Sequence, residues 1–520
     1  MGSIETVDYI VIGVYFAVVF TIGLTIARKT HSGEDLFLAG RTLGFAAIGF
    51  SLFASNISST SLIGLSGAAY KSGIAVSAYE WMAAVVLIFM AAIFIPLYLK
   101  ARITTVPEFL EKRFDRRSRV YFSLITIFLS IVVDTAGGLY AGALVLKVFF
   151  PDLVVWQTCV VLALIAGLYT AAGGLAAVVY TDVIQAVVLL MGTALLTYYV
   201  LDAYDFSWAA ATAATPDAHM HLIRGNDDPD MPWLGLITGV PILGFWYWTT
   251  NQYITQRVLG ARSVAHARWG AILGGLLKLV PLFTMILPGA LAIGLYPDLQ
   301  DPDLVFPTLV TELLPAGVVG LVLAGLIAAI MSSVDSTLNS ASALVVCDFI
   351  GAKQSLTPKA VAKAGRLTTL ILMVVAAAWA PMIEEFGGLF DYIQKSYAIL
   401  VPPIATIFLL GAFWRRGTGT AALTTLVVGH GVGLVFMVLS EQKIWNAHFT
   451  ITCALMTAVS IVVFVMVSLQ TAPTPKAQLA DSLWQPEMAR PTKGATGWRD
   501  YRVLSALLAA LTLWMVASFW

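Results

Sequence analysis

Long apolar runs fill most of the chain, and short polar segments separate them. Most of these runs approach or exceed the ~20 residues that a helix needs to cross the hydrocarbon core of a bilayer. The pattern therefore predicts an all-α, multi-pass membrane protein with about 14 transmembrane helices. The expected spans lie near residues 7–27, 43–70, 74–99, 119–149, 154–171, 176–201, 234–258, 268–295, 316–349, 366–384, 388–413, 419–440, 447–470 and 501–519. The apolar segment 303–314 is too short to span, and we expect a helix on the outer surface there.

The composition supports a protein embedded in lipid. Of its 520 residues, 59% are hydrophobic and only 12% are charged, whereas soluble proteins carry about 25% charged residues. The three cysteines stand alone in apolar segments and match neither a disulfide framework nor a CxxC metal motif. There is no phosphate-binding loop of the Walker type, which excludes a nucleotide-driven motor within this sequence. No histidine, cysteine or paired-carboxylate constellation at membrane depth indicates an enzyme.

The positions of the basic residues predict the orientation in the membrane. If the N-terminus lies outside and the spans alternate, most of the 30 Lys and Arg residues, Arg257 among them, fall in inner loops. An excess of Lys and Arg marks the cytoplasmic side, so both termini are expected outside. The acidic segment 202–233 is then an outer loop. The segment 471–500 is rich in Pro, Thr, Lys and Ala, which is typical of a flexible inner linker.

One polar stretch interrupts the second apolar run. The residues from Ser51 to Gly64 read SLFASNISSTSLIG. Lipid cannot satisfy the hydrogen bonds of such groups, so a polar run at this depth must face protein, water or an ion. We expect the helix to break here and its freed backbone carbonyls to hold a cation.

A second polar stretch, AIMSSVDSTLNSAS, runs from Ala329 to Ser342. On a helix its small and hydroxyl residues share one face. Such a serine stripe also occurs where small residues let helices pack closely and hydroxyls bond back to helix carbonyls. Asp335 and Asn339 within it favour a functional role, because a carboxylate inside a span is costly without a partner. Sodium is a hard cation that prefers oxygen ligands, so serine hydroxyls and bare carbonyls together would suit it.

Other polar side chains in the spans suggest a site for a neutral polyol. They are Glu80, Asn251, Lys278 and Gln394, with Tyr79, Trp248 and Tyr253 as aromatic neighbours. Sugar hydroxyls need both donors and acceptors, and the apolar face of a sugar ring stacks on aromatic rings. Two alternatives stay open. Lys278 is also explained by a structural ion pair, for example with Glu80, and the aromatic residues by anchoring at the lipid interface.

At this point the sequence resembles the solute:sodium symporter family, and within it the sodium/sugar cotransporters, which include sodium/glucose and bacterial sodium/galactose transporters. The matching stretches follow one another from about residue 50 to 415 and are highly specific together. They read SLFASNIS, AYEWM, PEFLEKRF, GGLAAVVYTDVIQ, NQYITQR, LLKLVP, AAIMSSVDSTLNS and FDYIQ.

The resemblance implies a fold of the leucine-transporter type. Its ten-helix core consists of two inverted five-helix repeats, and the first and sixth core helices are broken near the middle of the membrane. The implied divisions are an extra helix and loop at 1–42, the repeats at 43–201 and 234–415, the outer loop at 202–233, two added helices at 416–470, the linker at 471–500 and a last helix at 501–520.

The resemblance also implies a role for individual residues. The sodium site would use the carbonyls of Ala54, Ile57 and Ala329 and the hydroxyls of Ser332 and Ser333. The substrate site would comprise Ser61, Tyr79, Glu80, Asn251, Tyr253, Lys278 and Gln394. The outer gate would be formed by Leu65, Tyr79 and Phe390, and Asn56 would help to hold the inner gate.

The sequence departs from the family pattern at three places. Ser61 and Ala83 replace a glutamine and a serine of the galactose symporter, which shortens or removes two polar sugar contacts. Asp335 occupies a position where relatives with a second sodium carry a hydroxyl. A second cation near Asp182, Asp335 and Ser336 is therefore a hypothesis, and Asp182 is also explained as a residue at a helix start.

These features together predict a sodium-coupled importer of a sugar, a hexose such as galactose or glucose, that works by alternating access. Sodium is the expected co-transported ion, and a plasma membrane, such as a bacterial inner membrane, is the expected location. The alternatives are symport of another organic solute (a sialic acid, inositol or a carboxylate) and a symporter-like membrane sensor.

Overall fold

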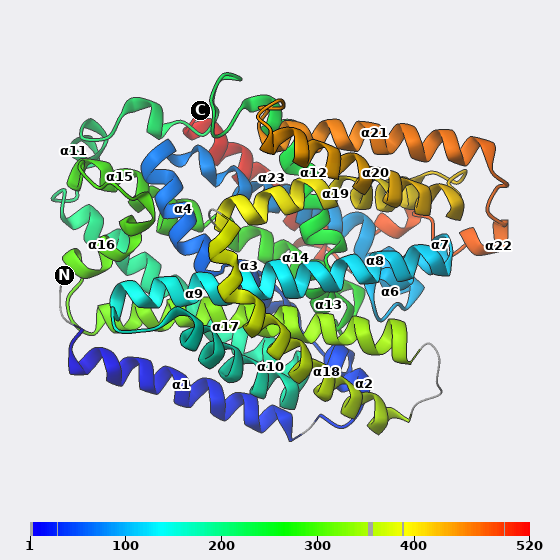
Figure 1. Ribbon diagram of the computed structural model, residues 1–520, viewed down its shortest axis with the longest axis horizontal. Coiled ribbons are helices and arrows are strands. Elements are labelled where there is room, and N and C mark those ends of the chain that lie inside the picture. The colour runs from blue at the N-terminus through cyan, green and yellow to red at the C-terminus, as the bar shows by residue number, and fades with distance from the viewer. Residues whose placement is uncertain (1–3, 29, 352–356, 387–388, 493–494) are drawn as a thin grey trace.

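The computed structural model describes residues 4–28, 30–351, 357–386, 389–492 and 495–520, leaving out the side chains of Thr60, Tyr169, 384–386, 389–392, Gln394 and Lys395. In this part of the chain the regular structure is helical, and one isolated bridge joins Leu43 to Ala261. The long helices run mostly along the longest axis of the molecule (Figure 1). The α-helices are α1 Thr6–Ala27, α2 Gly33–Leu38, α3 Phe45–Asn56, α4 Ser59–Ser72, α5 Ala78–Phe89, α6 Ile95–Ala101, α7 Val106–Arg113, α8 Arg116–Phe128, α9 Ala136–Phe149, α10 Val155–Asp202, α11 Trp208–Ala213, α12 Trp233–Phe245, α13 Gln252–Leu259, α14 Val264–Leu277, α15 Leu287–Leu295, α16 Val305–Leu313, α17 Val318–Leu344, α18 Pro358–Trp379, α19 Leu389–Phe413, α20 Gly419–Glu441, α21 Phe449–Gln470, α22 Lys476–Leu479 and α23 Tyr501–Ser518.

The prediction of a multi-pass, all-helical membrane protein is confirmed. Within the described residues, 11 helices are long and apolar enough to cross a membrane, or 12 when the bent pair α3 and α4 is counted as one span. The difference from the expected 14 lies at 154–171 and 234–258. The first contains only a short apolar helix, Val155–Leu168, and the second is interrupted by an extended residue, Asn251. The count of 14 stays a prediction.

A single glycine divides α10 into two parts. Gly174 has φ +60° and ψ −157°, which is a backbone conformation that favours glycine. A Cβ at this position would collide with the backbone of Leu36. The kink falls between the predicted spans 154–171 and 176–201, so the hydropathy pattern identified a true boundary.

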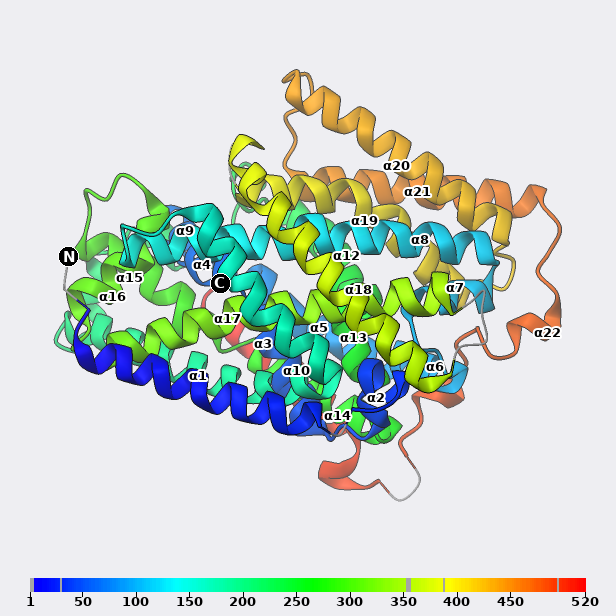
Figure 2. The same ribbon diagram turned by 60° about the horizontal axis from the view of Figure 1, so that its bottom comes forward.

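The serine-rich helix α17 lies at the centre of the bundle. It packs along α10 and is buried over almost its whole length. The α3 helix packs on α14 and also contacts α10 and α17. The α1 helix lies outside this core against α10 and α17, whereas α20 and α21 pair with each other on the opposite side (Figures 1 and 2). The arrangement places the two polar sequence stretches, on α3–α4 and α17, next to each other.

Both ends of the chain are held by specific contacts. The Asp8 carboxylate accepts hydrogen bonds from the backbone N–H groups of Gly317 and Gly320 at the start of α17, at 2.7 and 2.6 Å. Near the other end, the carbonyl of Phe519 accepts a hydrogen bond from the N–H of Leu222, in the acidic loop after α10.

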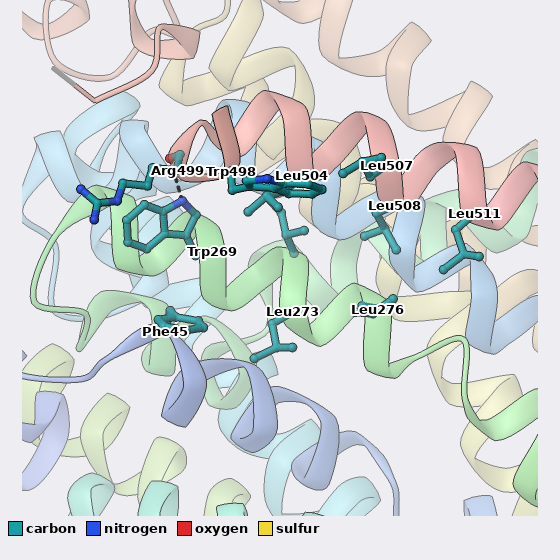
Figure 3. A pocket seen from close by; sticks show the side chains of 11 residues that line it. Phe45, Trp269, Leu273, Leu276, Trp498, Arg499, Leu504, Leu507, Leu508 and Leu511 are labelled. Carbon is teal, nitrogen blue, oxygen red and sulfur yellow. Dashed lines mark hydrogen bonds between the residues drawn. The ribbon is translucent and has the colours of Figure 1, made fainter. Parts of the chain in front are cut away.

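An apolar groove runs along α14 and α23 (Figure 3). It has a volume of about 480 Å³, and its lining includes Phe45, Trp269, Leu276, Trp498 and Leu508. The Trp269 indole N–H donates a hydrogen bond to the backbone carbonyl of Arg499 at its end, at 3.1 Å. None of the predicted site residues lines this groove, so the functional site must be sought among the buried polar groups.

Candidate functional site

The expected break in the second apolar run is present. The α3 helix ends at Asn56, Ile57 and Ser58 are extended, and α4 begins at Ser59 with its axis bent by 60° from that of α3. The Ser58 side chain caps α4 by accepting a hydrogen bond from the N–H of Ser61. Because helical hydrogen bonding stops here, carbonyls in the last turn of α3 lose their helical donors.

The serine face of α17 meets this break. The Ser332 hydroxyl donates a hydrogen bond to the Ala54 carbonyl at 2.8 Å, and the Ser333 hydroxyl donates to the Ala329 carbonyl at 3.1 Å. Ile57 lies at the break itself and is fully buried. The structure therefore brings together four of the five predicted sodium ligands in one hydrogen-bonded group and places the fifth three residues from Ala54.

A second polar cluster lies beside the first and is completely buried. The Asp182 carboxylate accepts hydrogen bonds from Ser51 and Ser55 of α3, at 2.5 and 3.1 Å. The Ser55 hydroxyl is 3.1 Å from the hydroxyl of Ser336, which in turn donates to Asp335 at 3.2 Å. The three residues of the hypothetical second cation site therefore belong to one cluster, which Ser51 and Ser55 complete.

The sequence interpretation of Arg257 was wrong. We counted it among the inner-loop cations, but its side chain is only 1% exposed and lies inside this cluster. Its guanidinium is 3.1 Å from Asp182 and also donates to the hydroxyls of Ser51 and Ser336, at 2.6 and 2.5 Å. The buried Asp182 carboxylate is the physical reason, because a carboxylate in the core requires a cationic or hydrogen-bonding partner.

The polar groups assigned to the substrate also converge. The Lys278 ammonium, at the end of α14, donates hydrogen bonds to the Glu80 carboxylate of α5 and to the Asn56 amide oxygen of α3. Glu80 is 6% exposed and Lys278 is 1% exposed. The ammonium also lies 5.9 Å from the ring centre of Trp248. The ion pair that the sequence left open is therefore present.

A second broken helix supplies the aromatic wall. The chain passes from α12 through a π-helical turn, Trp246–Thr250, to the extended residue Asn251, whose side chain caps α13. The Tyr253 hydroxyl donates to the hydroxyl of Tyr247 at 2.6 Å, and Tyr247 is hydrogen-bonded to Asn56. The sequence reasoning missed Tyr247, although its position in the aromatic run WYW just before the break was a usable signal.

The remaining predicted residues are more scattered. Ser61 is half-buried, and its hydroxyl donates to the carbonyl of Asn56 at 3.4 Å. Leu65 packs against the hydrophobic core, and the ring of Tyr79 stacks on Phe449 of α21 with 6.3 Å between centroids. The side chains of Phe390 and Gln394 lie outside the described residues, so their predicted roles stay predictions.

Comparison with known proteins agrees with this arrangement. The model of the sodium:solute symporter family matches residues 36–429. The chain is 35% identical to sodium/glucose cotransporter 4 of Danio rerio, over 93% of this chain and 81% of that protein. It is 32% identical to sodium/myo-inositol cotransporter 2 of Oryctolagus cuniculus, over 93% of this chain and 79% of that protein.

The fold is also similar to that of a solved transporter. A substrate-bound, outward-open Na⁺-coupled sialic acid symporter superposes with a TM-score of 0.81 at 22% identity, over 91% of this chain and 99% of that one. The family match and the long alignments with the cotransporters establish the relationship: this chain belongs to the sodium:solute symporter family.

Proposed function

We propose that this protein is a sodium-coupled symporter that imports a sugar, a hexose such as galactose or glucose, by alternating access. The observation that carries the proposal is the contact between Ser332 and the Ala54 carbonyl at the break between α3 and α4. It joins a broken helix and a serine-rich helix at a buried point, which is where this class of transporters binds its ions.

The sodium site in this proposal consists of the carbonyls of Ala54, Ile57 and Ala329 and the hydroxyls of Ser332 and Ser333. All five ligands are neutral oxygens. A monovalent hard cation suits such a set, whereas a divalent cation would favour carboxylates. A site without formal charge also binds loosely enough to release sodium on the inner side.

The proposed substrate site uses Glu80, Lys278, Asn251 and Gln394, with Ser61 at the break and Tyr79 and Tyr253 as aromatic neighbours. Glu80 and Lys278 offer an acceptor and a donor, which is the combination that sugar hydroxyls require. An anionic solute such as a sialic acid or another carboxylate would need a cation of its own. The ammonium of Lys278 is already paired with Glu80, and this observation favours a neutral solute such as a sugar or inositol.

A second sodium near Asp182, Asp335 and Ser336 is part of the proposal. Asp182 and Asp335 carry two negative charges in their ionised forms, and Arg257 supplies one positive charge. Among these three residues the formal charges then sum to −1. A monovalent cation would balance it, provided that the guanidinium leaves room beside Asp182.

The transport cycle follows from coupling between the two sites. Sodium favours the outward-open form, the sugar binds next to it, and the gates at Leu65, Tyr79 and Phe390 close over both. The inner gate, which Asn56 helps to hold, then opens and releases sodium before the sugar. Sodium must bind the sugar-competent state more tightly than the other states, since otherwise it would not couple the two fluxes.

This cycle is proposed to take place in a plasma membrane, such as a bacterial inner membrane, with both termini outside. The moving parts would be two inverted five-helix repeats at 43–201 and 234–415.

The direct test is uptake of labelled hexoses into proteoliposomes, with and without an inward sodium gradient. We expect uptake that depends on the gradient. Sugar uptake without sodium dependence would contradict the proposal. A thermal-shift screen with sugars, inositol, sialic acid and simple carboxylates identifies the solute class independently of transport.

The sodium site has its own test in the variant Ser333→Ala. Removing one oxygen ligand is expected to raise the sodium concentration for half-maximal uptake about tenfold, which corresponds to about 1.4 kcal/mol. Ser340→Ala is the control, because Ser340 is a buried serine on the same helix whose hydroxyl also donates to a carbonyl of that helix, the one of Thr337. An unchanged sodium dependence in Ser333→Ala would show that the ion binds elsewhere.

A further inference from the structure

A carboxylate that the site description has not used is linked to the aromatic residues before Asn251 through Tyr397. Asp134 belongs to a π-helical turn, Leu129–Thr135, between α8 and α9. The continuous helical segment Arg116–Phe149 is one of the candidate membrane spans. An acidic residue in such a position is costly and commonly functional, and π-turns within helices occur frequently at functional sites.

Asp134 has one hydrogen-bonded oxygen and one without a donor. The Tyr397 hydroxyl of α19 donates to Oδ1. Oδ2 is shielded from solvent, and no group in the described part of the chain donates a hydrogen bond to it. A buried acceptor without a donor costs free energy, so Oδ2 is positioned to accept a hydrogen bond from a ligand.

The neighbours of this pair belong to the candidate substrate site. The rings of Tyr397 and Trp246 lie 4.9 Å apart, and Trp246 begins the turn that carries Tyr247. Tyr247 is within electrostatic reach of both Asp134 and Glu80.

The position of Asp134 is fixed by the sodium-binding helix. The adjacent Thr135 hydroxyl is 2.6 Å from the hydroxyl of Thr337 on α17. Thr337 in turn donates to the carbonyl of Ser333, one turn earlier, at 2.9 Å. The carboxylate is therefore held by Tyr397 of α19, and the residue next to it is held by α17.

We propose that Asp134 is a specificity-determining residue whose Oδ2 accepts a hydrogen bond from one hydroxyl of the transported sugar. Tyr397 acts as a positioning residue that holds the carboxylate through Oδ1. The inference rests on the proposed sugar transport and adds a contact from the α9 and α19 side, away from Glu80 and Lys278 on α5 and α14. A hydroxyl matches Oδ2 because it donates a hydrogen bond without bringing a charge of its own.

The test compares sugar analogues rather than activity alone. For the hexose with the highest sodium-driven uptake, half-saturation is measured with the parent sugar and with each monodeoxy analogue, in the wild type and in Asp134→Asn. We expect the variant to raise the half-saturation concentration of the parent sugar at least tenfold. One analogue, which lacks the hydroxyl that Asp134 binds, should be transported equally by both proteins. Asp152→Asn, in the exposed turn after α9, is the matched control.

Each alternative outcome is distinguishable. An equal loss for every analogue, or no loss for any, overturns the role of Asp134 while sodium-driven sugar uptake by the wild type leaves the proposed function intact. No sodium-driven sugar uptake by the wild type overturns both. If sugar uptake depends on pH in the wild type but not in Asp134→Asn, the carboxylate acts in proton transfer, and this result would also overturn the inference.

Tyr397→Phe keeps the test decisive if Asp134→Asn does not fold. This variant removes only the hydroxyl that positions Oδ1. We expect its half-saturation concentration to rise less, about threefold, and only for the parent sugar and the analogues that keep the hydroxyl bound by Asp134. A rise of equal size for all analogues would contradict the positioning role.

Discussion

The Lys278 ammonium binds two oxygens at once, Glu80 on α5 and Asn56 at the break in α3. It therefore connects the proposed substrate site to the helix that carries Ala54, one of the proposed sodium ligands. Removing one member of a buried ion pair leaves the other charge without compensation, which typically costs 3–5 kcal/mol. Replacing both members by neutral side chains of similar volume costs much less.

The difference in stability between the single and the double replacement, measured together with sugar uptake, shows whether the ion pair only stabilises the fold or also takes part in transport. We expect Glu80→Gln alone to lower the melting temperature of the purified protein clearly, and Glu80→Gln combined with Lys278→Met to recover most of the loss. Sugar uptake should be lost in both proteins, because the double variant restores packing but not the donor and acceptor. A double variant that melts normally and transports sugar with an unchanged half-saturation concentration would make the pair purely structural.

At the level of helices, the two breaks show what the sequence could reveal. The break at Ile57 was predictable because a run of serines inside an apolar segment has no stable place in lipid. The break at Asn251 follows aromatic residues and two threonines, which do not disturb the apolar pattern, so only the resemblance to a family indicated it. Gly174 shows the reverse case, since hydropathy located the boundary although α10 continues almost without interruption.

Contacts between side chains on distant helices could not be predicted from the sequence. Arg257 and Asp182 are separated by 75 positions, and helical periodicity does not state which side chains of two helices face each other. The same limit applies to Tyr397 and Asp134, 263 positions apart. By contrast, Ala329, Ser332 and Ser333 lie within one turn of a single helix, so their common location followed from spacing alone.

The acidic loop after α10 is attached to α4 by a charge pair. Asp230 binds Lys71 at 3.0 Å and accepts a hydrogen bond from Ser72 at 2.5 Å. Partial burial acts in the opposite direction, but the hydrogen bond from Ser72 and the Lys71 ammonium, helped by His448, keep the pKa of Asp230 below its usual value. A carboxyl with a lowered pKa stabilises the folded form above its unfolded pKa of about 3.9, and this contribution is lost as the pH falls through the folded value.

We therefore expect the loop to detach from α4 in acid and to stay attached at neutral pH. Hydrogen exchange of the segment 219–231 should be slow at pH 7 and should accelerate below about pH 4 beyond the intrinsic pH effect. In Asp230→Asn the segment should exchange faster already at pH 7, and the acid-dependent change should disappear. Asp217→Asn, in the same loop and almost fully exposed, serves as the control. Identical profiles for wild type and Asp230→Asn would refute this attachment.

At the scale of the whole molecule, the number of sodium ions carried per sugar determines how steep a sugar gradient the transporter can sustain. One charge moving through 100 mV contributes about 2.3 kcal/mol, or roughly fiftyfold accumulation. A second sodium would raise this limit to about 2,500-fold. The proposed site at Ala54 and Ser333 offers only neutral ligands, so we propose that the charged cluster of Asp182, Asp335 and Arg257 is where a second ion would bind.

We expect two sodium ions per sugar in the wild type and one in Asp335→Asn. Within these three residues, the substitution leaves Asp182 and Arg257 as a neutral pair, so we expect the proposed second site to lose its affinity for a cation. The stoichiometry follows from the reversal potential of sugar flux in proteoliposomes at a fixed sodium gradient and a series of sugar gradients. The change in reversal potential per tenfold sugar gradient is inversely proportional to the number of ions carried, so this slope should double in the variant. Ser340→Ala, on the same helix, should keep the wild-type slope. If the wild-type slope corresponds to one ion per sugar, Arg257 already supplies all the cationic charge that the cluster accepts. If the slope is the same in the wild type and in Asp335→Asn, the second ion binds away from Asp335.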